Sequence, residues 1–166
     1  YTARLLIADG GVETLALHDT DPARADALGA ALAEIPGVPE VVEPADVAAD
    51  VVVLATDSEV PLESVASATG LVVSMGADTR WQHELPPVIA ERRPVCVDTR
   101  DSLATGDLAI WTQTGIIEPG DVVDLLDVVR AGPHATRPSV FVSTGSALFD
   151  NLAIDWLLRR EGVAGR

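Results

Sequence analysis

Lysine is absent from the sequence, whose 11 basic residues are all arginines. This absence excludes a Schiff-base lysine and a P-loop lysine from the chain. The 26 Asp and Glu residues outnumber the arginines, which gives a formal net charge of −15. A chain this acidic repels nucleic acid and anionic lipid, so we expect neither nucleic acid nor a membrane as its partner.

Cysteine is nearly absent as well. The one cysteine, Cys96, lies in the apolar run 94–97. A lone cysteine cannot form a disulfide within the chain or a thiolate metal site, and its apolar neighbours favour a buried structural role over that of a nucleophile. The three histidines, His18, His83 and His134, have no metal-ligand spacing, so we predict no metal site. We expect His18 to be structural and the other two to be exposed.

Long apolar runs are also missing. No run approaches the roughly 20 residues that span a bilayer, and no signal peptide opens the chain, so we expect a cytoplasmic protein. What is present is a hydrophobic fraction of 48% in 166 residues. This composition and length suit one folded domain with a sizeable core.

Strand-like and helical segments alternate along the chain. Asp50 to Ala55 and Leu71 to Met75 are apolar without alternation, as is typical of parallel strands buried on both faces. Thr20 or Asp21 can cap a helix that carries Pro22 in its first turn. The pattern predicts an α/β fold with a doubly wound, mainly parallel sheet in a three-layer α/β/α arrangement. Strands are expected at 12–18, 41–42, 50–55, 71–75, 95–97 and 139–142, and helices at 1–8, 22–34, 84–92, 102–108, 110–114, 121–130 and 147–160, with a turn or short helix at 45–49.

One carboxylate stands at the end of a predicted buried strand. The run 72–80 reads as a strand that continues into a tight loop carrying Gly76 and Asp78. Ligands of open α/β sheets bind beyond the carboxyl ends of the strands. Gly76 would let a ligand approach the backbone, and Asp78, partly desolvated there, could take a proton as general base. The other interpretation of Asp78 is an ordinary turn residue.

Three further segments follow predicted strands, and each has two interpretations. Asp19 can accept hydrogen bonds from an adenosine ribose, or it can cap the next helix. Thr56, Asp57 and Ser58 can line a cofactor groove, or they can form a loop that caps a helix. In the run 143–146, free backbone N–H groups can hold a polar or anionic ligand, or Ser146 can be an N-cap.

Four groups of residues together resemble the ornithine cyclodeaminase/mu-crystallin family. Each group is weak alone, but their order and spacing are specific, and the resemblance covers essentially the whole chain. The groups are Asp50 to Thr56; Ser74 to Asp78 followed by Gln82 to Leu85; Val97 to Arg100 with Gly106 to Leu108; and Phe141 to Gly145 with Asp150 to Ala153.

The resemblance implies the NAD(P)-binding domain of a longer enzyme. Members of the family are NAD(P)-dependent cyclodeaminases, alanine dehydrogenases, ketimine reductases and opine-like amino-acid dehydrogenases of about twice this length. A separate domain carries their dimer interface and the Lys and Arg residues that hold the substrate carboxylate. Residues 1–166 are therefore expected to be a Rossmann-like domain that lacks its first strand and glycine-rich turn. The expected whole is a homodimer acting on a small amino or imino acid.

Carried over position by position, the resemblance assigns a role to each candidate residue. It implies that Asp78 is the catalytic aspartate that handles the proton of the substrate amine. Asp19 and Thr20 match the ribose-binding position, and the absence of arginine beside them favours NAD over NADP. The remaining cofactor-binding positions are Thr56, Asp57, Ser58, Met75, Gly76, Ser143, Thr144 and Gly145. The run Thr79 to Gln82 departs from the Pro-Gly-Lys-like run of many cyclodeaminases, which leaves the substrate open.

Three hypotheses for the function result. The first is an NAD-dependent enzyme that removes hydride from an amino-acid α-carbon and forms an imine. The second is a non-catalytic, mu-crystallin-like protein that binds a nucleotide or small ligand. The third is a stand-alone regulatory nucleotide-binding domain, in which Trp81, Leu85 and Trp156 would lie on surfaces that are normally covered.

Overall fold

The structure, a computed structural model, describes residues 3, 6–7, 11–35, 40–42, 49–68, 70–92, 94–132 and 138–160. The chain folds as two compact units, Tyr1–Val47 and Ala48–Arg166. Ala3, Leu6 and Ile7 are helical, but most of the helix expected over 1–8 lies outside the described residues, as does most of the segment 45–49. Within the part of the chain that is described, no helix is long and apolar enough to cross a membrane.

The first unit is a β–α–β arrangement. Strands β1 (Thr14–Ala16) and β2 (Glu40–Val42) pair in parallel, and helix α2 (Pro22–Ala33) lies between them in the sequence. Asp21 is the N-cap of α2, since its Oδ1 accepts a hydrogen bond of 3.1 Å from the Ala23 N–H. Pro22 occupies the first turn, where a missing N–H costs nothing. Both strands and the helix confirm the prediction.

The second unit contains a five-stranded sheet in which every strand pair is parallel. The order across the sheet is β3-β4-β7-β5-β6. The strands are β3 (Val51–Leu54), β4 (Leu71–Ser74), β5 (Val95–Val97), β6 (Val122–Asp124) and β7 (Val140–Val142). Their last residues are in register, with Leu54 beside Ser74, Ser74 beside Val142, and Val97 beside both Val142 and Asp124. The carboxyl ends therefore form one level edge.

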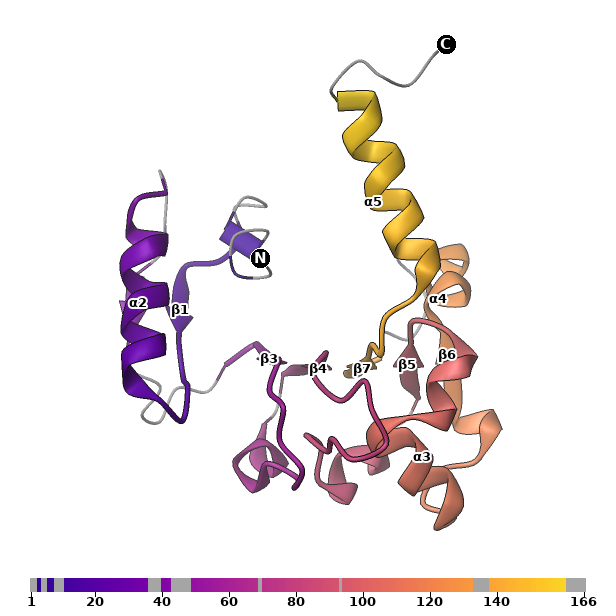
Figure 1. The fold of residues 1–166 in the computed structure, drawn as a ribbon. Helices are drawn as coiled ribbons and strands as arrows, with labels where there is room; N and C mark the ends of the chain where they lie inside the picture. Colours follow the sequence, from indigo (N-terminus) through magenta and orange to yellow (C-terminus); the bar gives the residue numbers. More distant parts are fainter. Residues whose placement is uncertain are drawn as a thin grey trace. The chain divides into compact units, whose positions relative to one another are not determined.

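Helices and 3-10 turns cover the sheet. Helix α3 (Gly106–Gln113) lies on one side of the strand row, and α4 (Leu125–Ala131) and α5 (Ala147–Arg160) lie on the other (Figure 1). The 3-10 turns of the second unit are η1 (Glu63–Ser67), η2 (Pro87–Glu91), η3 (Arg100–Ala104) and η4 (Pro119–Asp121). The parallel sheet with helices on both faces confirms the predicted fold class.

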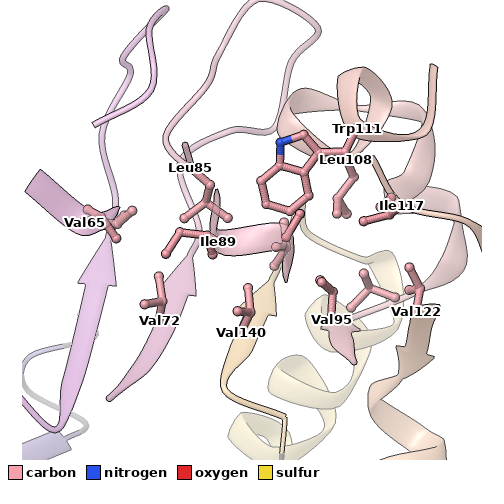
Figure 2. Close-up of a cluster of buried hydrophobic side chains, with 14 residues drawn as sticks. Val65, Val72, Leu85, Ile89, Val95, Leu108, Trp111, Ile117, Val122 and Val140 are labelled. Carbon is pink, nitrogen blue, oxygen red and sulfur yellow. The ribbon is translucent and has the colours of Figure 1, made fainter. Parts of the chain in front are cut away.

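The core lies between the sheet and the elements η2 and α3. Four valines stand side by side on neighbouring strands and point toward Leu85, Ile89 and Trp111 (Figure 2). The valines are Val72, Val140, Val95 and Val122. Leu85 is fully buried, so the surface position expected for it in a stand-alone domain is wrong, whereas Trp81 and Trp156 are exposed as expected.

The helix expected over 121–130 is wrong in its first half. Val122 to Asp124 form β6, and α4 begins only at Leu125. The Val122 side chain is buried and pairs with Val95, a tertiary contact that outweighs its helix-compatible spacing. Asp124 caps α4 in place of Asp121, because its Oδ1 accepts a 2.8 Å hydrogen bond from the Leu126 N–H.

Two other helical predictions are also corrected. The segment 84–92 contains only the 3-10 turn η2, since Pro86 and Pro87 cannot donate the hydrogen bonds of an α-helix there. The two short helices at 102–108 and 110–114 are instead η3 and α3. The chain breaks between them at Thr105, which is extended, and Gly106, whose φ is +52°. The strands at 50–55, 71–75, 95–97 and 139–142 and the helix at 147–160 are confirmed.

Candidate functional site

Three of the predicted segments meet at the carboxyl edge of the sheet. Residues 56–58 follow β3, residues 75–78 follow β4, and residues 143–145 follow β7. Because these three strands are parallel and adjacent, their following loops are neighbours. Asp19 and Thr20 follow β1 in the first unit.

The buried carboxylate of Glu84 ties the first two loops together. Its Oε1 accepts hydrogen bonds from the Thr56 N–H (2.6 Å) and the Thr56 hydroxyl (2.8 Å). Its Oε2 accepts from the Ser74 hydroxyl (2.6 Å) and the Gly76 N–H (3.0 Å). Glu84 is 0% exposed, and no cation among the described residues forms an ion pair with it. These neutral donors stabilise the charge in place of a cation.

Gly76 is required where the two loops meet. A Cβ atom at this position would lie 2.0 Å from the Thr56 carbonyl oxygen and 2.5 Å from Glu84 Oε1. Both distances are shorter than a carbon–oxygen contact allows, so a larger residue would push the loops apart. Gly76 is expected to let a ligand approach the backbone; in the structure the close approach is made by the Thr56 backbone and the Glu84 carboxylate.

A second buried carboxylate, Asp98, organises the loop after β7. Its Oδ2 accepts hydrogen bonds from the Ser143 hydroxyl (3.0 Å) and the Thr144 N–H (3.1 Å). Its Oδ1 accepts from the Thr99 N–H (2.7 Å) and the Ser102 hydroxyl. The ends of β5 and β7 are thereby joined in the same manner as those of β3 and β4.

The loop 143–145 has fewer free donors than the sequence suggests. The Ser143 N–H donates to the Ser74 carbonyl (2.9 Å), and the Thr144 N–H donates to Asp98. Two of the three N–H groups in this segment are therefore occupied within the protein. Gly145 has a φ of +85°, which favours glycine, and a Cβ there would meet no atom within 4 Å. Open space at Gly145 leaves room for a ligand against its backbone.

Asp78 is held at the edge of the site by its backbone. Its N–H donates to the Gly76 carbonyl (3.0 Å), and the Gly106 N–H donates to the Thr79 carbonyl (3.1 Å) on the other side. The side chain of Asp78 is exposed, so the expected partial desolvation is not present in this chain alone. Thr56, Asp57 and Met75 are exposed as well. Solvent-facing polar groups at the loop tips are available to a ligand.

Comparison with family models gave no match. A curated relative, the L-lysine cyclodeaminase of Streptomyces rapamycinicus, is 38% identical over 90 residues, which are 52% of this chain and 25% of that protein. Among solved structures, the iminosuccinate reductase of Paracoccus denitrificans in complex with NAD+ is 27% identical. Its TM-score is 0.72, and the match covers 91% of this chain and 50% of that one. A probable ornithine cyclodeaminase from Bordetella pertussis Tohama I is 25% identical with a TM-score of 0.71, over 96% of this chain and 56% of that one.

The chain is similar to the cyclodeaminases among these relatives, which supports its resemblance to the ornithine cyclodeaminase/mu-crystallin family. It spans about half the length of the solved relatives and a quarter of the curated one in the matched region. The Rossmann-like class predicted for the fold is confirmed by the same relatives.

The loop after Asp78, where the sequence departs from the run of many cyclodeaminases, is closed by a side-chain contact. Gln82 Oε1 accepts hydrogen bonds from the Thr79 N–H (3.1 Å) and the Thr79 hydroxyl (2.8 Å). Trp81, between them, is 72% exposed. A large apolar ring is thus exposed in the same loop as the predicted catalytic aspartate.

A third buried carboxylate, Asp107, holds the segment that carries Glu84. Its Oδ2 accepts from the Glu84 N–H (3.0 Å) and the Leu85 N–H (3.1 Å). Burial raises the pKa of Asp107, while these hydrogen bonds and the nearby His83 act in the opposite direction. His83 Nδ1 lies 3.5 Å from Asp107 Oδ1. The expectation that His83 is exposed is wrong, since its side chain is only 14% exposed.

Other predicted positions have clear local environments. Asp19 Oδ1 accepts from the Asp21 N–H (2.9 Å), so Asp19 shapes the turn before α2 while Asp21 caps the helix. His18 is exposed, which does not fit the structural role expected of it, and His134 lies outside the described residues. Cys96 is buried as expected, and burial, followed by Asp124 and Asp98, raises its pKa to about 11.

Sequence motifs did not reveal Glu84, Asp98 and Asp107 as site residues. Asp98 carries the same signal as Asp78, because it directly follows a fully apolar strand. Glu84 and Asp107 lie in segments that carry the family resemblance. The residues around them in the sequence do not indicate that these two side chains are buried. Only the tertiary contacts distinguish a carboxylate that organises loops from one that faces solvent.

Proposed function

We propose that the protein carrying this chain is an NAD-dependent enzyme acting at the α-carbon of a small amino or imino acid. The observation that carries the proposal is the shared carboxyl edge, where the loops after β3, β4 and β7 adjoin in a fold whose relative was solved with NAD+. The named relatives, two cyclodeaminases and an iminosuccinate reductase, support the same chemistry.

The residues at this edge suit a dinucleotide. Thr56, Asp57, Ser58, Met75 and Gly76 would line the cofactor groove. Ser143, Thr144 and Gly145 would face the nicotinamide, and the open space at Gly145 leaves its backbone accessible to a ligand. In the first unit, Asp19 and Thr20 are the residues that the family resemblance assigns to the adenosine ribose, and an acidic Asp19 disfavours the 2′-phosphate of NADP. NAD supplies hydride acceptance and donation when bound.

The chain's own contribution is proton handling and placement. Asp78 is the group we assign to the proton of the substrate amine, since a carboxylate exposed at the loop tip can reach a bound molecule. Loss of hydride from the α-carbon gives a substrate imine. The imine is then hydrolysed, trapped by a side-chain amine or reduced again. Hydrolysis of the imine releases ammonia and completes a dehydrogenation. In cyclodeamination the side-chain amine adds to the imine, ammonia leaves and the cyclic imine takes the hydride back, whereas an imine reductase starts from the imine.

We also propose that residues 1–166 make up the NAD(P)-binding domain and that both units belong to it. The substrate carboxylate site and a homodimer interface would then lie in chain outside this sequence. The support is that the solved relatives are about twice as long as the region they share with this chain. A cytoplasmic location is part of the same proposal.

The first test is Asp78→Asn in the full-length protein. NAD binding should be unchanged, because Asn keeps the loop's size, whereas turnover should fall at least about 10²-fold with the loss of the acid/base group. NAD affinity by calorimetry and NADH absorbance with amino and imino acids measure the two quantities. Asp101→Asn, which removes an exposed carboxylate elsewhere, is the matched control.

Near-normal turnover of Asp78→Asn would refute the role assigned to Asp78. If the wild-type protein binds NAD but no amino or imino acid changes NADH absorbance, the non-catalytic, mu-crystallin-like binding protein is the better description.

A further inference from the structure

Glu84 stands where the proposed site's first two loops converge. Its carboxylate bonds to the backbone of Thr56, after β3, and of Gly76, after β4. Thr56 and Gly76 belong to segments that are well separated in the sequence. Among the described residues, no other side chain forms hydrogen bonds to the backbone of both segments. Asp78 follows Gly76 by two residues, so its placement depends on the same contact.

A carboxylate can accept hydrogen bonds from the donors of both loops at once. An ionised carboxylate has two oxygens and about four acceptor positions, and here it accepts four hydrogen bonds. A glutamine side chain has one oxygen and one NH2 group. The hydroxyls of Thr56 and Ser74 can rotate and accept a hydrogen bond from this NH2 group. A backbone N–H is only a donor and cannot accept one. Either orientation of a glutamine amide at this position would therefore direct a donor at the N–H of Thr56 or of Gly76.

The backbone of Glu84 is itself fixed by hydrogen bonds. Its N–H donates to Asp107 of α3 (3.0 Å), and its carbonyl accepts from the Leu62 N–H (2.9 Å). The preceding His83 N–H donates to the Ser58 carbonyl (2.7 Å). The carboxylate thus projects from a backbone that is fixed on both sides, which lets it impose a position on the loops rather than follow them.

We propose that Glu84 is a positioning residue that sets the spacing between the loop 56–58 and the loop 75–78. It touches no ligand and acts through Thr56 and Gly76. The consequence for binding and turnover rests on the proposed function, whereas the effect on the two loops does not.

The experiment compares Glu84→Gln with Ser74→Ala in the full-length protein. Both variants remove donors or acceptors from the same carboxylate cluster, but Ser74→Ala leaves both backbone N–H bonds intact. Hydrogen exchange, measured by mass spectrometry on peptides covering 55–58 and 75–78, reports the loops directly. In Glu84→Gln at least one of these peptides should exchange at least tenfold faster. In Ser74→Ala neither should change by more than about twofold.

NAD affinity gives the second readout. Glu84→Gln should bind NAD at least tenfold more weakly, while Ser74→Ala should stay within about threefold of wild type. If the loops loosen as expected but the wild-type protein binds no NAD, the positioning role stands and the proposed function fails. If wild type binds NAD and Glu84→Gln shows unchanged exchange in both loops, the positioning role is overturned.

Glu84→Asp guards against a variant that does not fold. It keeps the charge, but its side chain is one methylene shorter, so it should reach one loop and release the other. Unchanged exchange in both loops would again overturn the inference. If both Glu84 variants fail to fold while Ser74→Ala folds, the carboxylate supports the whole sheet, and a role confined to the loops is overturned as well.

Discussion

At the scale of single residues, three buried carboxylates position the loops at the carboxyl edge of the sheet. Glu84, Asp98 and Asp107 are each at most 3% exposed, and all are satisfied by backbone N–H and hydroxyl donors. Burying an unpaired charge costs several kcal/mol, and charge-assisted hydrogen bonds offset that cost. In a chain without lysine, neutral donors from the loops take the place of cations. The same bonds then dictate where the loops lie.

Asp107 leads to a prediction about pH. Its folded-state pKa is raised by burial, so the folded state holds this proton at pH values where the unfolded state has lost it. Ionisation of Asp107 therefore opposes folding above the raised pKa, and the penalty is relieved as pH falls toward 3.8, the ordinary value. Asp107→Asn removes the charge and keeps a carbonyl oxygen for the Glu84 and Leu85 N–H groups. At pH 7–8 the variant should be at least as stable as wild type.

The test is thermal unfolding of wild type and Asp107→Asn between about pH 4 and 8. The advantage of the variant should shrink as the pH falls. Asp107→Ala is the control: it leaves two buried N–H groups unpaired and should cost about 1–3 kcal/mol for each at every pH. A loss of stability in Asp107→Asn that is greatest at pH 8 would show that the ionised carboxylate favours folding, contrary to the expected sign.

At the scale of elements, the segment 119–131 shows how a strand and a helix share a short sequence. Val122 and Val123 pair with β5, and the chain enters α4 at Leu125. The change of direction is made at Asp124, which ends β6 and caps α4. Asp124→Ala should therefore destabilise the protein by about 1 kcal/mol, the usual effect of losing an N-cap.

Thermal unfolding measures this loss as well. Asp127→Ala, in the first turn of α4 but exposed, is the matched control and should change stability by less than about 0.5 kcal/mol, since exposed ion pairs such as that with Arg130 contribute little. Equal effects of the two variants would mean that helix-terminal charge, rather than the cap, stabilises α4.

The elements that the sequence predicts correctly are those marked by neighbouring residues, such as a cap or a continuous apolar run. Asp21 with Pro22 marks the start of α2, and the apolar runs of β3, β4 and β5 mark buried parallel strands. The spacing of Val122 fits a helix as well as a strand, and only pairing with Val95 decides between them. The site, too, has some features that neighbouring residues predict and others that depend on tertiary contacts. Residues after strands could be predicted to share an edge, but the burial of Glu84 depends on contacts 28 residues away.

At the scale of the whole molecule, charge is the dominant feature. The net charge is −15, and exposed arginines pair with only a few of the carboxylates, such as Asp21, Asp127 and Asp155. Most carboxylates therefore repel one another across the surface. Such repulsion opposes the compact state, and its range falls from about 30 Å at 0.01 M salt to about 10 Å at 0.1 M.

Added salt should consequently stabilise the protein. Raising NaCl from about 0.01 M to about 0.5 M should increase the free energy of unfolding by on the order of 1 kcal/mol, which is a rise in Tm of about 2–4 °C. A variant that neutralises three exposed carboxylates, Asp26→Asn with Glu59→Gln and Glu91→Gln, should begin with a higher Tm at low salt and respond less to NaCl. Scanning calorimetry at matched pH compares the two proteins. If both respond equally, salt acts by a general solvent effect; if the wild type responds more strongly, screening of surface repulsion is the cause.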